Sequence, residues 1–434
     1  MDLETLGHAS LLIRDDVGVP VLLTDPWLTG SCYWRSWWLQ NYPQPPLLDV
    51  VNRVPFCFIT HEHPDHFHTA SIRTLDKRIR FLAPDLPEEH IASYLREHGY
   101  RADVVPARQW MALAPGIRML SIPLFNDDSA LLVDTPDAFI INLNDSKPRR
   151  QQLRQLRADL DSLVPRKKRI LLSSYSPASI VNSFTRNAER VSLRDKRDYV
   201  DYVCDNCAVL NADYFLPFAS QVIYRRPDST WANHFKVTYD DLRAHWRGST
   251  ALLPPFVRLN LCDGSHTFVP PSDYAARETE ACAKVREQEA AEAAADFSAV
   301  DVERLRRKLN ACRWFLALCF PRGIGFRLDR QTLRYSPWSG AIATGTLGGD
   351  VVFNVPTRAF KDAVEYGHFG DLGITMFTMV ALNEGVHPRR VYAFFMIITM
   401  NDYQHTVSPS NFVKWLRRAL RVQSWHLPKP TAAA

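Results

Sequence analysis

The chain has 434 residues, of which 46% are hydrophobic and 23% are charged. These proportions are typical of a folded globular protein, and the length exceeds what one hydrophobic core usually supports, so we expect two domains or one large domain with an appendage. The formal net charge is +5, but the basic residues are scattered among 47 acidic ones and form no basic stripe, which argues against a nucleic-acid partner. The basic balance is compatible with a small anionic or thioester-bearing substrate.

Membrane, export and disulfide signals are weak. The N-terminus lacks the basic start and apolar core of a signal peptide, and the most apolar stretch, residues 391–400, is too short to cross a bilayer. We therefore expect a cytoplasmic protein with no membrane span. The eight cysteines are irregularly spaced, which argues against a disulfide framework. Cys204 and Cys207 lie in a stretch with helical spacing, and we interpret them as buried thiols rather than a metal-binding pair.

Strand-like and helix-like patterns alternate through the N-terminal part of the chain. We expect strands and helices between them to build a sheet sandwich flanked by helices, forming a domain over residues 1–273. The expected strands cover residues 8–16, 21–28, 54–60, 80–84, 102–107, 117–125, 129–133, 138–144, 169–176 and 213–220, with early helices at 69–79 and 87–100.

The second half of the chain has a different organisation. Residues 274–295 are rich in Ala and Glu with weak apolar patterning, which predicts a helical connector. A long amphipathic helix at 300–320 and strand-like stretches at 323–329, 332–336 and 349–356 predict an α+β domain over residues 296–425. We interpret it as a lipid-transfer-like domain that covers the substrate entrance; a stability or dimerisation domain is the alternative. Residues 426–434 are expected to be a disordered tail.

Residues 58–68 read FITHEHPDHFH and concentrate four histidines and two acids directly after an apolar strand. In extended backbone, side chains two residues apart point the same way, so His61 and His63 can bind one cation. Pro64 redirects the chain, and Asp65 and His66 would face a second cation. Surface histidines in a polar loop are the alternative, but an HxHxDH spacing after an apolar strand favours a dinuclear metal site.

Two predicted hairpins bring further candidates to one end of the fold. A turn at residues 134–137 places Asp128 and Asp145 together at the open end, where one could cap a metal and the other bridge two. A turn near residues 16–17 likewise brings His8 and Asp25 together. They are candidates for orienting metal ligands by hydrogen bonds, and a satisfied buried histidine is the alternative for His8. An aromatic cluster follows that hairpin and would either line a substrate pocket or pack in the core: Trp27, Tyr33, Trp34, Trp37 and Trp38.

The chain resembles the metallo-β-lactamase superfamily through GHASLLI, LLTDPWL, THEHPDHFH and NLNDS, in that order. The resemblance implies an α/β fold, an αββα sandwich. Shorter elements, SWWLQNYPQPPLLD, NDDSALLV and LPFAS, resemble CMP-N-acetylneuraminate hydroxylase-like proteins and the diiron monooxygenase type of platensimycin and platencin biosynthesis. The paired Cys and His elements of a Rieske iron-sulfur domain do not occur in the sequence, so electrons would come from an external donor.

The resemblance also implies a ligand set. It assigns His61 and His63 to the first metal, Asp65 and His66 to the second, and Asp145 to a bridging position. Where the superfamily has a third histidine before residue 129, this chain has only acids, so Asp128 is the expected replacement and Asp127 its substitute. The last histidine of the pattern corresponds to His234, with Asp228 as a rival donor and a structural role for His234 as the alternative.

Three functions are compatible with this pattern. The carboxylate-rich ligand set favours two iron ions and a monooxygenase that uses O2 and external electrons to hydroxylate an unactivated C–H bond of a biosynthetic intermediate. The second is a dinuclear zinc hydrolase that attacks an ester, amide or phosphodiester with an activated water. The third is a binding protein with a degenerate site.

Overall fold

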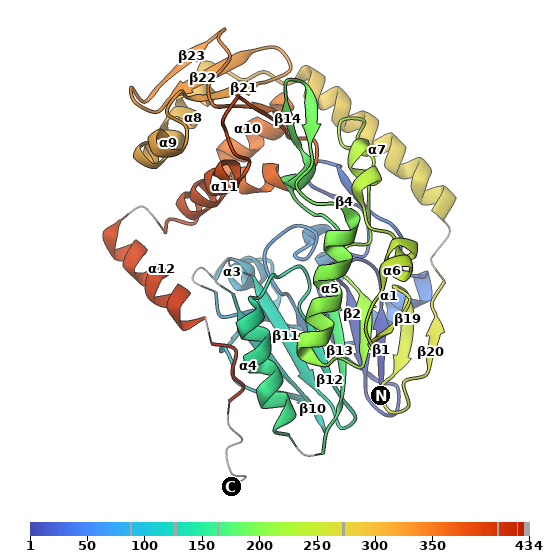
Figure 1. Cartoon of the computed structure of the whole chain (residues 1–434). Coiled ribbons are helices and arrows are strands. Elements are labelled where there is room, and N and C mark those ends of the chain that lie inside the picture. The colour runs from blue at the N-terminus through green and yellow to red at the C-terminus, as the bar shows by residue number, and fades with distance from the viewer. Residues whose placement is uncertain are drawn as a thin grey trace.

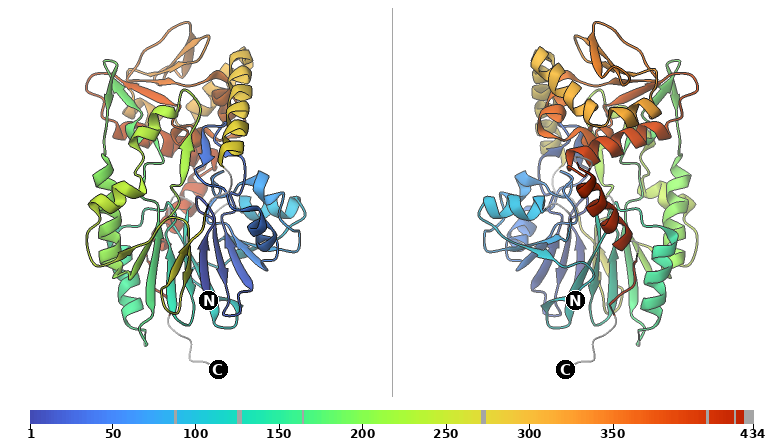
Figure 2. Two further views of the ribbon diagram at one scale, coloured as in Figure 1. Left: turned by 90° about the vertical axis from the view of Figure 1, so that its right-hand side faces the viewer. Right: turned by 90° about the vertical axis from the view of Figure 1, so that its left-hand side faces the viewer.

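The computed structural model describes residues 1–86, 89–124, 128–163, 165–270, 274–405, 408–422 and 424–428. Two large sheets lie face to face in the lower half of Figure 1, and helices cover the outer face of each, as the side views of Figure 2 show. This arrangement confirms the expected αββα sandwich. A third sheet with its own helices lies above the sandwich.

The first sheet of the sandwich has eight strands in the order β20-β19-β1-β2-β3-β6-β7-β8. In chain order, their bounds are β1 Asp2–Thr5, β2 Leu11–Arg14, β3 Pro20–Thr24, β6 Phe56–Phe58, β7 Arg80–Pro84, β8 Arg101–Val105, β19 Val257–Asn260 and β20 His266–Phe268. Apolar side chains on its outer face pack against three short helices, α1 Pro45–Val51, α2 Thr69–Ile72 and α3 His90–Glu97. Helix α2 is shorter than the 69–79 segment expected from the sequence.

The second sheet has seven strands in the order β18-β16-β13-β12-β11-β10-β9. Their bounds are β9 Met111–Ala114, β10 Ile117–Pro123, β11 Ser129–Asp134, β12 Ala138–Asn142, β13 Lys168–Ser173, β16 Tyr214–Pro217 and β18 Ala251–Leu252. Its outer face carries α4 Arg150–Asp161, α5 Lys196–Leu210 and α6 Tyr239–His245. Cys204 and Cys207 are buried, free thiols on α5, as predicted.

The main core of the sandwich lies between the two sheets. Successive side chains of a strand point to opposite faces, so Leu11 and Ile13 enter this core while Leu12 packs under the outer helices. Ile140 and Leu216 reach the same core from the second sheet. Because helices cover both outer faces, the central strands are apolar on both sides, which explains why they read as continuous hydrophobic runs.

The third sheet has the order β15-β14-β25-β24-β21-β22-β23. Its strands are β14 Phe184–Arg186, β15 Glu189–Val191, β21 Ile324–Arg327, β22 Thr332–Ser336, β23 Ala341–Thr344, β24 Val351–Asn354 and β25 Met379–Leu382. The hairpin β14–β15 comes from within residues 1–273 and pairs in parallel with β25. The expected boundary at residue 273 is therefore wrong for this hairpin, which belongs to the C-terminal sheet.

The helices of the upper part are α7 Tyr274–Ala294, α8 Ala299–Ala311, α9 Arg313–Cys319, α10 Thr357–Tyr366, the 3₁₀ turn η3 Phe369–Gly373, α11 Arg389–Asp402 and α12 Pro409–Arg421. Helix α7 confirms the predicted connector helix. Phe326, Phe353, Phe360 and Phe394 lie at the centre of the core that the helices share with the third sheet. Among the described residues, no helix is both long and apolar enough to cross a membrane.

The end of the chain returns to the sandwich. Trp425 is fully buried in the core beneath α4 and α5, and the Leu427 backbone N–H donates to Asp159 of α4 at 2.7 Å. Residues 426–428 are thus ordered, contrary to the tail prediction, and residues 429–434 lie outside the described residues. Three short strands, β4 Ser31–Cys32, β5 Trp37–Leu39 and β17 Val222–Tyr224, form a small separate sheet.

Candidate metal centre

Several strands of the sandwich end at the same edge, and the candidate ligands lie in the loops there. Leu11 pairs with Thr24, which places His8 and Asp25 at one end of the β2–β3 hairpin. Leu131 pairs with Asn142, which places Asp128 and Asp145 at the open end of the β11–β12 hairpin. The 61–66 loop follows β6, which runs parallel to β3. The structure therefore confirms both hairpin predictions and brings these segments together.

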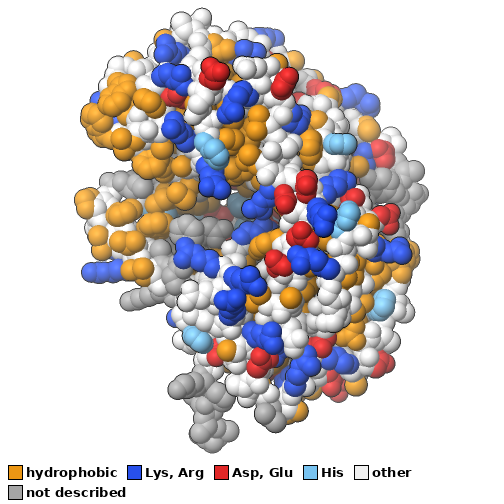
Figure 3. All heavy atoms as spheres, in the orientation of Figure 1, with side chains coloured by type: hydrophobic (Ala, Val, Ile, Leu, Met, Phe, Trp, Pro, Cys, Tyr) orange, Lys and Arg blue, Asp and Glu red, His pale blue; other side chains and the backbone are white. Residues whose placement is uncertain are grey.

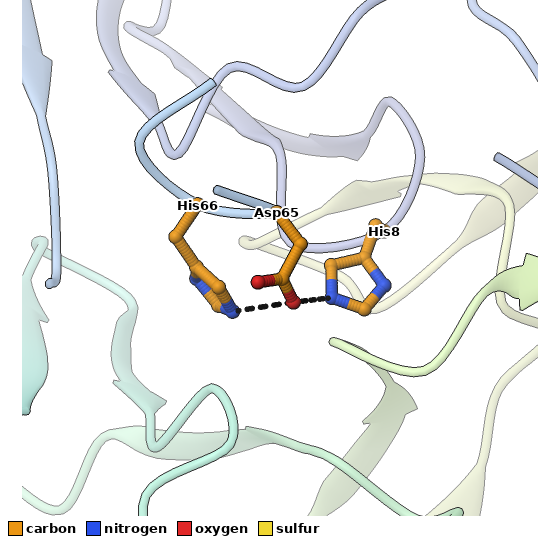
Figure 4. A group of neighbouring side chains, drawn as sticks. All are labelled: His8, Asp65 and His66. Carbon is orange, nitrogen blue, oxygen red and sulfur yellow. Dashed lines mark hydrogen bonds and ion pairs between the residues drawn. The ribbon is translucent and has the colours of Figure 1, made fainter. Parts of the chain in front are cut away.

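One group of potential ligands consists of His8, Asp65 and His66 (Figure 4). His8 Nε2 lies 2.9 Å from Asp65 Oδ2, and His66 Nε2 lies 3.5 Å from the same oxygen. One ligand atom from each residue lies within 4.8 Å of the others, and all three residues are buried. This clustering fits a single cation.

The second group consists of His61, His63 and Asp145, again with ligand atoms within 4.8 Å of one another. His61 Nε2 lies 2.9 Å from His63 Nδ1 and 3.8 Å from Asp145 Oδ1. Asp128 Oδ1 lies 3.3 Å from His61 Nδ1, so this buried carboxylate borders the group from the other side of the ring.

Asp145 lies between the two groups. Its Oδ1 is 3.8 Å from His61 of one group, and its Oδ2 is 3.8 Å from His66 of the other. Asp145 Oδ1 and His66 Nε2 are buried and have no hydrogen-bond partner among the residues that the structure describes. Buried polar atoms are normally paired, so unpartnered donor atoms that converge here fit a pair of cations with Asp145 between them.

A buried network orients this cluster. The Asp25 carboxylate accepts hydrogen bonds from the Thr60 backbone N–H and hydroxyl, both at 2.7 Å, and lies 2.9 Å from His66 Nδ1. This leaves His66 Nε2 directed toward Asp65 and Asp145. Tyr33 donates a hydrogen bond of 2.6 Å to Asp65 Oδ1. Such partners fix the ring orientation and tautomer of a metal-binding histidine.

The backbone around the centre adopts uncommon conformations. Asp25, Asn144 and Ala219 have φ values of 38°, 43° and 46°, in the left-handed region that side chains other than glycine rarely adopt. The Asp25 carboxylate accepts from the backbone N–H of Thr60, the residue directly before the 61–66 loop. Asn144 precedes Asp145 in the sequence, and the Ala219 N–H donates to the His8 carbonyl. Each unusual conformation thus directs a segment that carries a candidate ligand, in keeping with the tendency of backbone strain to occur at functional sites.

The electrostatics of the cluster indicate crowded negative charge. Burial and the nearby Asp145 charge raise the pKa of Asp128 well above its usual value. Burial disfavours the charged form of His66, but the carboxylates of Asp65, Asp145 and Asp25 outweigh this effect and raise its pKa to about 10. In the absence of other cations, a proton on His66 offsets the negative charge of these three carboxylates. Metal cations would take over that role.

The remaining predicted residues lie elsewhere. His234 is in the 3₁₀ turn η2 Thr230–Phe235, is exposed, and belongs to neither group, so its assignment as a ligand is wrong in this structure. Its rival Asp228 pairs through both oxygens with Arg226, at 3.0 and 2.7 Å, and also lies outside both groups. Asp127 lies outside the described residues. His68 caps α2 by accepting a hydrogen bond from the Ser71 backbone N–H.

Sequence reasoning gave His8 an orienting role, but the structure places it inside a ligand group, with its Nε2 2.9 Å from Asp65 Oδ2. His8 and Asp65 are 57 positions apart, so only the fold reveals their contact. In the sequence, the GHAS element at residues 7–10 was the feature that could have indicated His8 as a ligand. His8 is buried beside Asp65, and within the described part of the chain its Nδ1 has no hydrogen-bond partner, which distinguishes it from a satisfied core histidine.

Two cavities adjoin the metal centre at His63. One, of about 300 Å³, lies mainly among C-terminal residues, including Asp371, Phe395, Met400 and Trp415. The other, of about 660 Å³, is bordered by Tyr33, Trp34, Glu62 and Tyr94 and also reaches Asp371. The C-terminal part thus forms a wall beside the centre.

The aromatic residues between positions 27 and 38 have two roles: some pack in the core, and others border the larger cavity. Trp27, Trp37 and Trp38 are almost completely buried, which confirms the core-packing interpretation for these three. Tyr33 and Trp34 border the larger cavity, and Trp34 Nε1 donates to Asp362 of α10 at 3.0 Å. Only the second pair therefore lies where a substrate could contact it.

Comparisons with known proteins agree with the sequence motifs. No family model matches the chain. It is 34% identical to a cytidine monophosphate-N-acetylneuraminic acid hydroxylase from Asterias rubens over 80 residues, which are 18% of this chain and 11% of the relative. The homologue from Cricetulus griseus is 21% identical over 261 residues, or 55% of this chain and 43% of the relative. The chain resembles the metallo-β-lactamase-fold superfamily.

The matches to these hydroxylases span less than half of each relative's length. Among solved structures, the metallo-beta-lactamase fold protein YhfI from Bacillus subtilis is 10% identical, with a TM-score of 0.39 over 59% of this chain and 98% of that one. The similarity to hydroxylases and the His and Asp groups together indicate an enzyme that binds metal.

Proposed function

We propose that the chain is a nonheme diiron monooxygenase that hydroxylates an unactivated C–H bond of a small biosynthetic intermediate. His61 and His63 would hold the first ion, and Asp65, His66 and His8 the second, with Asp145 able to contribute to both. Asp128, which the sequence predicts as a further donor to the first ion, would have to turn from the Nδ1 side of the His61 ring toward His63. The observation that carries this proposal is the pair of ligand groups that meet at Asp145, whose two oxygens face different histidines at 3.8 Å.

The choice of iron rests on the donor atoms. Three carboxylates among seven ligands make a harder set than the histidine-rich zinc pair typical of hydrolases, and hard oxygen donors suit oxidised iron. Two iron ions held here would supply dioxygen activation with two electrons from an external donor. The overall reaction is R–H + O2 + 2 e⁻ + 2 H⁺ → R–OH + H2O, in which one oxygen atom enters the substrate and the other leaves as water.

The residues of this chain perform the remaining tasks. Asp25 and Thr60 hold His66 in one orientation, and Tyr33 holds Asp65. His63 borders both cavities, so a substrate bound in either would lie beside the first ion. The C-terminal wall limits the access of water and stray reductants to this position. The similarity to proteins named as hydroxylases supports the reaction class.

Metal analysis tests the proposal before any substrate is identified. Protein produced with enriched ⁵⁷Fe should contain about two irons per chain and show a coupled pair in Mössbauer spectra. After reduction with dithionite, its spectrum should change on exposure to O2. Asp145→Ala should lose the coupling, whereas His234→Ala should retain it. Two irons that remain uncoupled, or that show no response to O2, would contradict the proposal.

A dinuclear zinc hydrolase is the second candidate. The group of His8, Asp65 and His66 favours it, because two histidines and one carboxylate are an ordinary zinc ligand set. Zinc ions here would lower the pKa of a water molecule for attack on an ester, amide or phosphodiester. Two zincs per chain, no spectral response to dithionite and O2, and turnover of a chromogenic ester would establish this alternative.

A further inference from the structure

Helices of the C-terminal part expose apolar side chains on one side of the molecule. On α12, Phe412, Leu416 and Leu420 are four positions apart, so they lie on one helical face, and they are 43%, 43% and 66% exposed. On α9, Trp314 and Leu318 are also four positions apart, and they are 66% and 79% exposed. The apolar face of an amphipathic helix normally packs against a core, so these two faces lack their usual cover.

These residues belong to one surface, which we call the apolar helical surface. Its main exposed residues come from α9, α11 and α12 and are Trp314, Leu318, Met396, Phe412, Leu416 and Leu420. Figure 3 shows hydrophobic side chains gathered along the side of the molecule that carries these helices, on the left of the view, with Lys and Arg beside them. The right-hand panel of Figure 2 faces the same side. Large exposed apolar patches of this kind mark sites where a protein binds a partner or a membrane.

The apolar helical surface adjoins a cavity that reaches the metal centre. Met396 of α11 is 48% exposed and also borders the cavity of about 300 Å³ that extends to His63. Trp415 of α12 borders the same cavity. Whatever covers this surface therefore lies next to the cavity.

The three helices that carry this surface are strongly basic. Helix α9 has one Lys or Arg residue, α11 has two and α12 has four, whereas the one acid in their sequences is Asp402 of α11. The Asp402 side chain is only 6% exposed and pairs with Lys308, so it does not offset the charges on the surface. The apolar helical surface thus lies in a region of positive charge.

On α12, the cations lie on a different side of the helix from the apolar face. Lys414 and Arg417 are exposed and border a cavity that they share with Asp85 and Glu89 of the sandwich. Because a helix with its side chains is about 10–12 Å across, these cations remain within about one Debye length of whatever contacts the apolar face. Their charge therefore acts on a partner that docks there.

A membrane that contains anionic lipids is complementary to both properties. Trp, Phe and Leu side chains can enter the boundary between lipid headgroups and acyl chains, while Lys and Arg attract anionic headgroups. A second copy of the chain is less complementary, because a two-fold interface centred on this surface would place the same cations against one another. The charge of the helices therefore favours the lipid surface.

We propose that the apolar helical surface docks on the surface of an anionic membrane. The apolar faces of α9 and α12 enter the headgroup region, and the basic residues of the same helices attract the anionic headgroups. Docking in this way places the cavity bordered by Met396 and Trp415 next to the bilayer. The inference does not depend on the proposed function or on which metal the centre binds.

Co-sedimentation of the full-length, metal-containing protein with lipid vesicles tests the proposal. Vesicles of phosphatidylcholine with about one third phosphatidylglycerol are compared with vesicles of phosphatidylcholine alone. The protein should bind the mixed vesicles, and Leu318→Gln and Leu420→Gln should each weaken binding about tenfold, because each removes one leucine from the lipid contact. Lys414→Gln should weaken binding about fivefold. Val17→Gln is the matched control, because Val17 is 77% exposed between β2 and β3 of the sandwich and should bind like the wild type.

Several results would overturn the proposal. Wild-type protein that stays in the supernatant with both kinds of vesicle would do so, as would equal binding to phosphatidylcholine alone. Unchanged binding in both leucine variants, or an equal loss in Val17→Gln, would show that this surface is not the contact. Sedimentation velocity of the lipid-free protein tests the second copy. A dimer that both leucine variants dissociate, in a protein that does not bind vesicles, would assign the surface to self-association instead.

Discussion

Asp25→Asn tests whether the buried network controls the metal centre. Asparagine tolerates a positive φ better than most residues, so the substitution preserves the backbone at φ 38° and changes only the carboxylate. The new amide group can face Thr60 and His66 with either its oxygen or its nitrogen. If the oxygen accepts from the Thr60 backbone N–H, the nitrogen faces His66 Nδ1 and donates to it. The His66 proton then moves to Nε2, the atom needed for the metal.

The size of the effect follows from these contacts. Asp25 makes two hydrogen bonds of 2.7 Å with Thr60 and a 2.9 Å contact with His66, all buried. Loss of the charged acceptor should cost about 1.5–3 kcal/mol of unfolding free energy. Substitution of such a partner of a metal-binding histidine typically weakens metal binding by about 10–100-fold. We expect this loss at the ion held by His66, with a smaller change at the other.

The assay combines chelator competition, read by elemental analysis, with urea unfolding of metal-free protein. Asp103→Asn serves as the control, because Asp103 forms an exposed ion pair with Arg80 that should contribute little to stability. One strongly and one weakly bound ion in Asp25→Asn would support the reasoning. Wild-type affinity for both ions would refute it, and so would an equal loss of both.

Four further predictions concern single residues. Asp145→Ala should abolish metal pairing and turnover together, and an intact coupled pair would remove its bridging role. His8→Ala should lose one ion per chain by elemental analysis, whereas His234→Ala should keep both, and the opposite pattern would restore the sequence-based assignment. Trp425→Ala should lower the unfolding free energy by about 3–5 kcal/mol in urea titrations, since the side chain is fully buried; a change below about 1 kcal/mol would contradict this. Cys204→Ala should leave metal content and turnover unchanged, because the thiol is buried on the far side of the second sheet.

The HxHxDH loop and the two hairpins were predictable because short-range rules govern them. Alternation along a strand places His61 and His63 on one side, and hairpin register places Asp128 near Asp145 without knowledge of the rest of the fold. The αββα sandwich followed from the motifs and the alternation of strands and helices. For the same reason, the buried thiols on α5 and the connector helix α7 could be recognised from local spacing.

The errors share a different cause. His234 was chosen because it was the nearest histidine in sequence to the expected position, but η2 leaves it exposed. The hairpin β14–β15 pairs with β25, almost 200 positions away, and no local pattern specifies that partner. The final segment looked like a tail, although Trp425 packs beneath α4. Each case depends on long-range contacts that a single sequence does not encode in its local pattern.

The sequence by itself determined the chemistry available at the centre: histidines and carboxylates at ligand spacing after an apolar strand, held by hairpins whose register is local. The tertiary structure decided which of these groups meet. It placed His8 against Asp65 and set Asp145 between His61 and His66. The physical reason is that spacing along a strand or helix determines which residues are neighbours over a few positions. The packing of the two sandwich sheets and the third sheet determines which residues distant in the sequence become neighbours.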